Sequence, residues 1–146
     1  IMEIKKLEKK DIHGCALELM QAFKGEPWNE DWTYEQAYLR IEQIMANPFA
    51  RGYIICDQDK VVAMSCGRIM TYLDSQEFWI DEFSVDPSYQ GQHLGQKLMD
   101  HIKEEMKKEE IESLVLITCR HFPCESFYKK QGYQIKEQDI LMYCDL

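Results

Sequence analysis

The first part of the chain contains one short apolar run and two stretches in which apolar residues recur at helical spacing. Residues 2–7 predict a first strand, and the stripe over 12–24 predicts a helix on one face of the future core. A second helix is well delimited, because Thr33 and Gln36 have the spacing of a capping box and Pro48 follows the last apolar turn. The pattern therefore begins as strand, helix, helix.

The period changes to that of strands in the middle of the chain, and helices return later. Strands are predicted at 53–56, 61–66, 78–85, 113–118, 133–136 and 140–144, and helices at 94–109 and 123–131. The run at 113–118 is almost continuously apolar, which is typical of a strand covered on both faces. The order β-α-α-β-β-β-α-β-α-β-β predicts an α/β (mixed α+β) fold. We expect a central, mostly antiparallel mixed sheet of six to seven strands with helices on both faces.

Composition limits the class of protein. The 146 residues are 45% hydrophobic and 29% charged, as in a globular domain, and their number suits one domain over 1–146. Acids outnumber bases 26 to 17, a net charge of −9 that argues against nucleic acid or an anionic membrane as partner. The chain has no apolar run of membrane-spanning length and no signal-peptide pattern. Its 6 cysteines are scattered, which favours free thiols and a cytoplasmic location.

The four histidines do not predict a metal site. They lack both the paired spacing and the pattern of acidic companions that a ligand motif has. Cys119 and Cys124 lack a His and Asp pattern around them, so a covalent acyl-enzyme is not favoured. We expect no metal cofactor.

The segment 80–98 carries the clearest chemical signal. A predicted strand runs into a turn with Gly91 and Gly95 and then directly into an amphipathic helix. The free amides at such a helix start, together with the helix dipole, can bind a phosphate or pyrophosphate. The same glycines also suit a tight turn and a close contact between helix and strand, so both interpretations stay open at this point.

The chain resembles the GNAT superfamily of acyl-CoA-dependent N-acetyltransferases over nearly its whole length. Two segments carry this resemblance. The run from Val85 to Gly95 is similar to the family's Arg/Gln-x-x-Gly-x-Gly/Ala loop, and Ser126 to Tyr133 resembles its Phe-Tyr-x-x-x-Gly-Phe signature. His93 stands where the loop usually has its first glycine. His121 and Cys124 stand where many members have Asn and Ala.

The resemblance implies that acetyl-CoA is bound along the predicted strand and loop. Its pyrophosphate is expected on the amides of the loop, and its pantetheine along the backbone of the strand, where the amide of Phe83 or Ser84 polarises the thioester carbonyl. The expected cofactor-binding residues are Phe83, Ser84, Val85, Gln90, Gly91, Gln92, His93, Leu94, Gly95, Gln96, His121, Ser126 and Tyr128.

Acetyl transfer to an amine needs a proton acceptor for the amine and a proton donor for the leaving thiolate. Tyr128 is the expected donor, and a packed aromatic with a satisfied hydroxyl is the alternative. Glu82 is the preferred base and Asp81 the reserve, although either could form an ordinary ion pair. Because they are adjacent on a strand, the two acids are expected to face opposite sides.

The acceptor is predicted from the acidic and aromatic segment between the first two helices. Trp28, Glu30, Asp31 and Trp32 suit a small cationic amine such as an aminosugar, aminoglycoside or polyamine, with Tyr72, Asp81 and Glu82 on the same surface. A solvated acidic loop with packed indoles is an equal alternative. A protein or peptide N-acetyltransferase, a non-catalytic acyl-CoA sensor and an interaction domain without CoA affinity also stay open, and the sequence does not exclude a homodimer.

Overall fold

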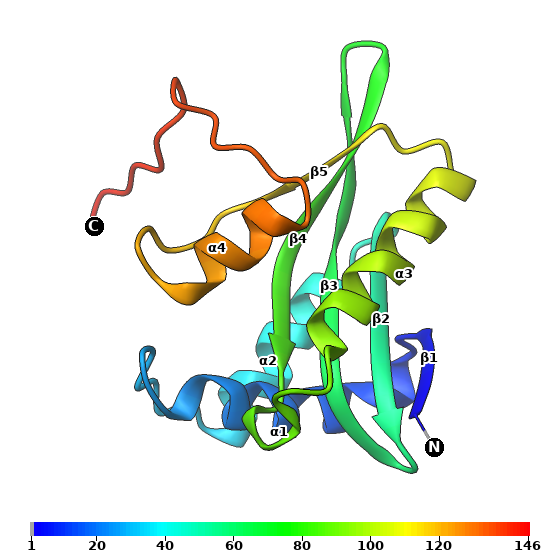
Figure 1. Cartoon of the computed structure of the whole chain (residues 1–146), viewed down its shortest axis with the longest axis vertical. Coiled ribbons are helices and arrows are strands. Elements are labelled where there is room, and N and C mark those ends of the chain that lie inside the picture. Colours follow the sequence, from blue (N-terminus) through cyan, green and yellow to red (C-terminus); the bar gives the residue numbers. More distant parts are fainter. Residues whose placement is uncertain (1) are drawn as a thin grey trace.

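The computed structural model describes residues 2–146 as a five-stranded sheet flanked by helices (Figure 1). The strands lie in chain order, and every pairing is antiparallel except the parallel pairing of β4 with β5. The bounds are β1 Met2–Lys6, α1 Ile12–Lys24, α2 Tyr34–Met45, β2 Ala50–Asp57, β3 Lys60–Tyr72, β4 Ser75–Val85, α3 Leu94–Lys108, β5 Ser113–Leu116 and α4 Pro123–Lys130, with short 3-10 turns η1 Lys9–Asp11 and η2 Pro87–Tyr89.

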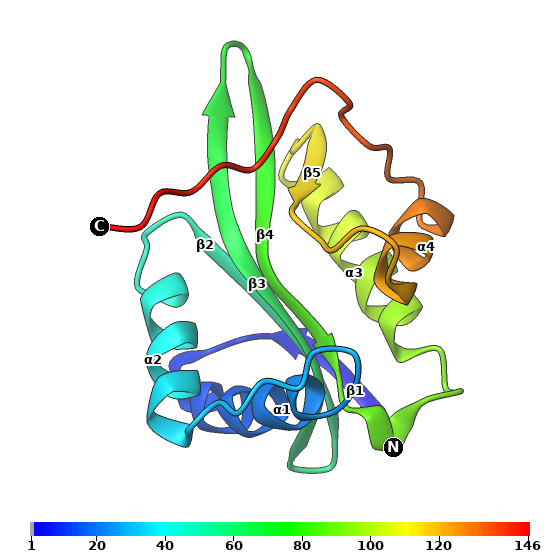
Figure 2. The ribbon, with the colours of Figure 1, turned by 90° about the vertical axis from the view of Figure 1, so that its left-hand side faces the viewer.

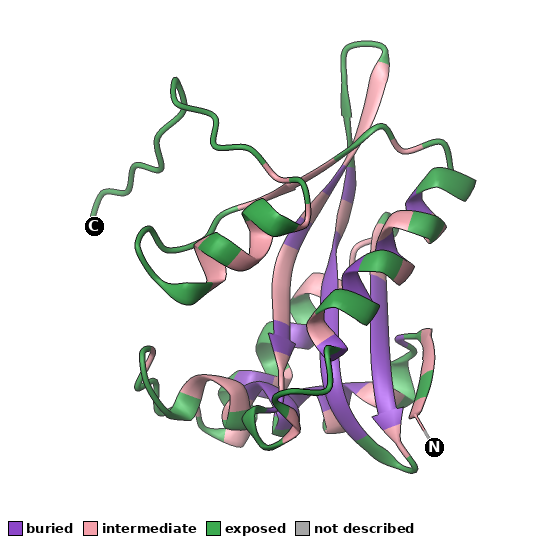
Figure 3. Ribbon diagram, in the orientation of Figure 1, coloured by how far each residue is buried: buried purple, intermediate pink, exposed green. Residues whose placement is uncertain are grey.

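Helices cover both faces of the sheet, as predicted (Figure 2). Helices α1 and α2 pack on one face around Leu19, Ile41 and Met64, and α3 packs on the other around Phe78 and Leu98. Figure 3 shows burial concentrated in the central strands and in the inner faces of these helices. The mixed α/β class is confirmed.

Local signals placed several boundaries correctly. Thr33 and Gln36 form the predicted capping box, in which each side chain bonds the other residue's amide, at 3.1 and 3.0 Å. In the part of the chain that the structure describes, no helix is long and apolar enough to cross a bilayer.

The register between β3 and β4 shifts beside the two candidate acids. Glu82 pairs with Cys66 and Ile80 with Gly67, so Asp81 is the extra residue of a β-bulge. The extra residue interrupts the alternation of side chains along the strand, so Asp81 and Glu82 face the same side of the sheet. The expectation that they face opposite sides is therefore wrong. Gly67 permits the bulge, because a Cβ there would lie 1.9 Å from the carbonyl oxygen of Trp79.

The two closing strands predicted at 133–136 and 140–144 are not formed, and the sheet has five strands instead of six or seven. Residues 134–146 are exposed and have no strand neighbour, and a β-pattern becomes a strand only when another strand pairs with it. Without the closing strands, β5 lies at the edge of the sheet. Ile117, just after β5, is 64% exposed, so the run at 113–118 is not covered on both faces as expected.

Candidate active site

The loop before α3 presents unused backbone amides. No acceptor among residues 2–146 bonds the amides from Gly91 to Gln96, whereas the amide of Gln90 is occupied by the carbonyl of Pro87. Leu94, 2% exposed, anchors the helix in the core. These amides lie at the positive end of the helix dipole, an arrangement that favours an anion.

His93 and Gly95 shape this loop in different ways. His93 has a left-handed backbone, with φ of 58°, directly before α3, so the histidine adopts the conformation that glycine would favour. A Cβ on Gly95 would lie 3.3 Å from the Phe127 ring, so the small residue lets α3 approach α4. Gln92 is exposed in the same turn.

Strand β4 has an open backbone edge next to this loop. The amide of Asp86 donates to a carbonyl of β3, at 2.8 Å, and backbone groups alternate in direction along an antiparallel strand. Ser84 therefore bonds β3 as well, and Phe83 and Val85 direct their amides and carbonyls the other way. The pairing of β5 with β4 ends at Ile80, so the amides and carbonyls of Phe83 and Val85 have no strand neighbour. These backbone groups are therefore available to pair with an extended polar chain.

Glu82 lies on the α1–α2 face with a single strong partner. Nε of Arg40 donates to Oε2 of Glu82 at 2.8 Å, and the Glu82 side chain is 10% exposed. Burial raises the pKa of Glu82 above its ordinary value. Arg40 opposes this shift, while Asp81 and Glu30 reinforce it. A carboxyl with a raised pKa is a suitable proton acceptor for an amine.

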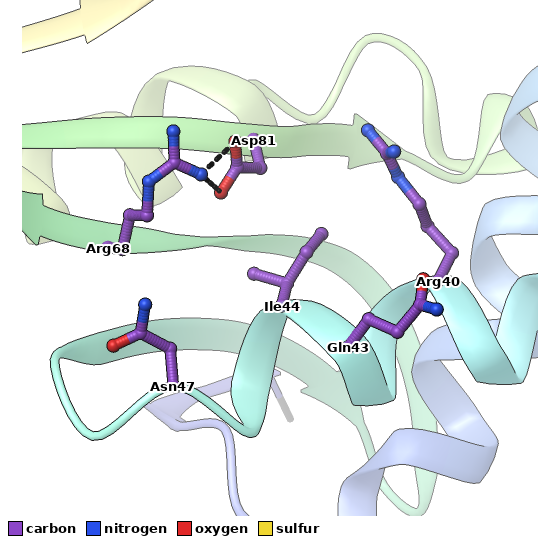
Figure 4. A pocket seen from close by; sticks show the side chains of 6 residues that line it. All are labelled: Arg40, Gln43, Ile44, Asn47, Arg68 and Asp81. Atoms are coloured by element: carbon purple, nitrogen blue, oxygen red, sulfur yellow. Dashed lines mark hydrogen bonds and ion pairs between the residues drawn. The ribbon is translucent and has the colours of Figure 1, made fainter.

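Asp81 faces the same side and pairs with Arg68, whose Nη1 lies 3.2 Å from Oδ2. Together with Arg40, Gln43, Ile44 and Asn47, these two residues line a pocket of about 220 Å³. Figure 4 shows the two guanidinium groups on opposite sides of this pocket, with the Arg68–Asp81 pair at one end. The pocket thus combines a carboxylate with several donors.

Tyr128 packs on the opposite face of β4. Its ring contacts Phe83 and Tyr133 edge to face, with centroids 6.0 and 5.4 Å apart. No hydrogen-bond partner of its hydroxyl is found in residues 2–146. Burial, with smaller contributions from Tyr133, Cys124 and Glu82, raises the pKa of Tyr128. The phenol therefore stays protonated and able to donate.

Sequence reasoning missed a buried acid beneath β4. Glu18 is 2% exposed, and its Oε1 accepts a hydrogen bond from Oγ of Ser84 at 2.6 Å, while Oε2 has no partner. Burial raises the pKa of Glu18 to about 8. The available signal was an acid inside the apolar stripe of α1, directly beside Leu19. Arg40 and Arg68 were also missed, because their partners are distant in sequence.

The predicted substrate residues are only partly gathered. Trp28 packs between Phe23 and Phe122, with centroids 5.5 and 5.6 Å away, so the α1–α2 loop contacts the segment before α4. The indole nitrogen of Trp32 donates to Glu30 at 2.8 Å.

Asp31 is exposed nearby in the same loop. Tyr72 lies at the tip of the β3–β4 hairpin, about 20 Å along the strand from the level of Glu82, and stays outside this group.

Two cofactor candidates lie around the start of α4. His121 is exposed, and its backbone amide donates to Oε1 of Glu125 at 2.7 Å. Ser126 is exposed on the helix itself.

Among residues 2–146, no three His, Cys, Asp or Glu side chains are arranged to hold a metal ion.

The site thus brings together a helix start with free amides, an open strand edge, an acid on one face of β4 and a phenol on the other. Residues 15–133 match the family model described as the Acetyltransferase (GNAT) family. The chain belongs to this family.

One curated protein and several solved structures are similar to this chain. A Bacillus subtilis (strain 168) protein, named provisionally as a [ribosomal protein bS18]-alanine N-acetyltransferase, is 29% identical over 109 residues, which are 74% of this chain and 65% of that protein. A ribosomal-protein-alanine N-acetyltransferase from Brucella melitensis biovar Abortus 2308 has a TM-score of 0.77 at 15% identity, covering 99% of this chain and 100% of its own.

A structure described as a transcriptional regulator from Bacillus halodurans C-125 has a TM-score of 0.80 at 18% identity. It covers 99% of this chain and 100% of its own. At such identities the solved structures show the fold alone.

Proposed function

We propose that the protein is an acetyl-CoA-dependent N-acetyltransferase that acetylates a primary amine by direct attack on the thioester. The observation that carries this proposal is the row of unused amides from Gly91 to Gln96 beside the open edge of β4. A pyrophosphate suits the amides, and a pantetheine arm suits the edge. Acetyl-CoA would supply the activated acyl group.

The remaining chemistry belongs to residues of this chain. The amide of Phe83 faces the open edge and would polarise the thioester carbonyl. Glu82, with its raised pKa, would accept a proton from the amine. Tyr128, on the other face of the same strand, would protonate the departing thiolate, and its raised pKa keeps that proton available at neutral pH.

The first candidate acceptor is a small cationic molecule, such as an aminosugar or polyamine. Glu82, Asp81 and Glu30 supply the negative charge for this acceptor, and Trp28 and Trp32 supply aromatic walls. The attraction is reduced by the arginines that pair with the two β4 acids.

The second candidate acceptor is the α-amine of a protein or peptide. It is favoured by the pocket beside Asp81, because Arg40, Arg68, Gln43 and Asn47 offer donors for backbone carbonyls. The name given to the Bacillus subtilis relative points the same way.

We also propose that residues 1–146 act as one domain and that the protein works in the cytoplasm, where its free thiols would stay reduced.

Calorimetric titration with acetyl-CoA, followed by free-thiol release with an amine panel, tests the proposal. The panel contains an aminoglycoside, a polyamine, a peptide with a free N-terminus and the same peptide with its N-terminus acetylated. We expect acetyl-CoA binding and thiol release with at least one amine. Release with the free but not the blocked peptide selects the second acceptor.

Two results would overturn the enzyme assignment. Absence of acetyl-CoA binding would remove the cofactor site. Tight binding without thiol release across the panel would instead indicate an acyl-CoA sensor.

A further inference from the structure

The two arginines of the pocket beside Asp81 have unused hydrogen-bond donors. Nε of Arg40 bonds Glu82, and no acceptor in residues 2–146 bonds Nη1 or Nη2 of Arg40. Arg68 bonds Asp81 through Nη1 alone, so Nε and Nη2 of Arg68 have no partner in the same part of the chain. The two guanidinium groups lie on opposite sides of the pocket (Figure 4). An acceptor-rich group between them would meet free donors from both sides.

The side chain of Asn47 adds a donor to this pocket. Its Oδ1 accepts a hydrogen bond from the backbone amide of Phe49 at 2.7 Å, so the oxygen is occupied and the amide nitrogen is the free end. In Figure 4 this nitrogen points toward the level of Arg68. Asp81 is the only carboxylate among the residues that line the pocket. The lining therefore favours a ligand group that accepts hydrogen bonds.

Asp81 takes up little of the donor capacity of Arg68. Its two oxygens lie 3.2 and 3.3 Å from Nη1, longer than the roughly 2.7–2.9 Å of a strong charge-assisted hydrogen bond. The free Nε and Nη2 form the side edge of the guanidinium, whose two parallel N–H groups match the two oxygens of a carboxylate. The Arg68 side chain is 39% exposed, so a group from solvent can reach this edge. A second carboxylate can bind Arg68 without displacing Asp81.

We infer that the pocket binds a carboxylate carried by the acceptor, an inference that rests on the proposed function. Arg40 joins the pocket to the candidate base, because its Nε bonds Glu82 while the rest of its side chain lines the pocket. On β3, Arg68 lies two residues, about 7 Å, from the position that pairs with Glu82. The acceptor is therefore a short molecule or chain end in which the amine and the carboxylate are close neighbours.

The charges of the site fit such an acceptor. Arg40 and Arg68 balance Asp81 and Glu82 when both acids are ionised. Once Glu82 has accepted the proton that the attacking amine releases, Arg40 faces a neutral carboxyl and one positive charge is left over. A carboxylate on the acceptor compensates this charge. Its contribution should therefore appear in kcat/KM as well as in binding.

Thiol release with two matched pairs of amines tests the inference. Alanine is compared with alaninamide, and alanyl-glutamic acid with alanyl-glutamine, both dipeptides being amidated at the C-terminus. We expect kcat/KM, referred to the unprotonated amine, to be about tenfold higher for the carboxylate in one of the pairs. Preference in the first pair identifies the α-carboxylate of a free amino acid, and preference in the second an acidic side chain of a peptide.

Two variants with opposite expected effects separate recognition from folding. Arg68→Gln removes the guanidinium and should abolish the preference for the carboxylate. Asp81→Asn removes the competing acid and should increase it. Both substitutions break the same ion pair, so a purely structural role of that pair would change the preference in the same direction. The matched control is Arg51→Gln, which breaks the ion pair with Glu109 at the end of α3 and should keep the preference.

The inference and the proposed function fail in different ways. Turnover with equal kcat/KM within both pairs, a preference that survives Arg68→Gln, or a preference that Asp81→Asn lowers would overturn the inference and leave the transferase assignment in place. If Arg68→Gln does not fold, Arg68→Lys keeps the charge without the side edge and should lower the preference about as far.

Absence of thiol release with every amine counts against the proposed function instead. Calorimetric titration of the same two pairs into the protein with CoA, or into the protein alone if CoA does not bind, then tests the pocket without turnover. About tenfold tighter binding of the carboxylate in one pair would support the inference. Equal affinities within both pairs would overturn it.

Discussion

Nε of Arg40, on α2, lies 2.8 Å from Oε2 of Glu82, on β4, and this contact joins the helical face to the strand that carries the candidate base. Burial and Arg40 shift the pKa of Glu82 in opposite directions. Burial favours the neutral carboxyl, whereas the guanidinium favours the charged carboxylate, and burial has the larger effect. Arg40 therefore limits how far the pKa of Glu82 rises.

Replacing Arg40 should shift the pH dependence of the reaction. In Arg40→Gln the pKa of Glu82 rises further, so the acidic limb of kcat/KM moves to higher pH. The pH–rate profile for thiol release measures this shift. The control is Arg51→Gln, which breaks the distant ion pair with Glu109 and should leave the limb in place. An unmoved limb in Arg40→Gln would mean that Glu82 is not the base.

Tyr128→Phe removes a buried hydroxyl while keeping the aromatic packing against Phe83. If the phenol protonates the thiolate, kcat falls about 10²-fold with little change in acetyl-CoA affinity. Tyr133→Phe is the matched control, because that hydroxyl bonds the sulfur of Met99 in the core. Equal turnover in the parent and Tyr128→Phe would remove Tyr128 from the mechanism.

Features set by neighbouring residues could be predicted from the sequence, and features set by distant packing could not. The capping box of Thr33 and the glycine turn before α3 depend on a few consecutive positions, and both were placed correctly. The bulge at Asp81 depends on the contact of Gly67 with another strand, which no local pattern reveals. The closing strands had the right composition but no neighbour in the chain.

Glu18 should make stability fall as pH rises. Its folded pKa, about 8, is above the unfolded value of 4.5, so its contribution is full below pH 4.5 and is lost between pH 4.5 and 8. Glu18→Gln removes this pH dependence. Between pH 4.5 and pH 8 the unfolding free energy of the variant should therefore rise relative to that of the parent, by about a few kcal/mol.

Urea unfolding at the two pH values measures the change. The exposed Glu104, on α3, provides the control Glu104→Gln. Parallel pH dependence of the parent and Glu18→Gln would contradict a buried, protonated Glu18.

Gly67→Ala should disrupt the bulge that places both acids on one face. The added methyl would lie 1.9 Å from a main-chain oxygen, which cannot be relieved by a side-chain rotation, so we expect a loss of about 3 kcal/mol in unfolding free energy. Gly25→Ala is the matched control, since a Cβ there meets nothing within 4 Å. Equal denaturation midpoints for the two variants would show that the bulge tolerates a side chain.

Gln96→Glu separates the stability of α3 from its proposed role in binding acetyl-CoA. Gln96 is exposed in the first turn of the helix, where a carboxylate interacts favourably with the dipole and should add about 0.3–1 kcal/mol of stability. The same charge would repel a pyrophosphate on the neighbouring amides, and acetyl-CoA affinity should fall about tenfold.

Gln36 occupies the corresponding third position of α2, so Gln36→Glu is the matched control and keeps its capping box. That variant should share the gain in stability and bind acetyl-CoA like the parent. Calorimetry and thermal unfolding of the three proteins measure both quantities. If Gln96→Glu binds acetyl-CoA as tightly as the control, the pyrophosphate does not lie at the start of α3, because a charge added there would otherwise act directly against it.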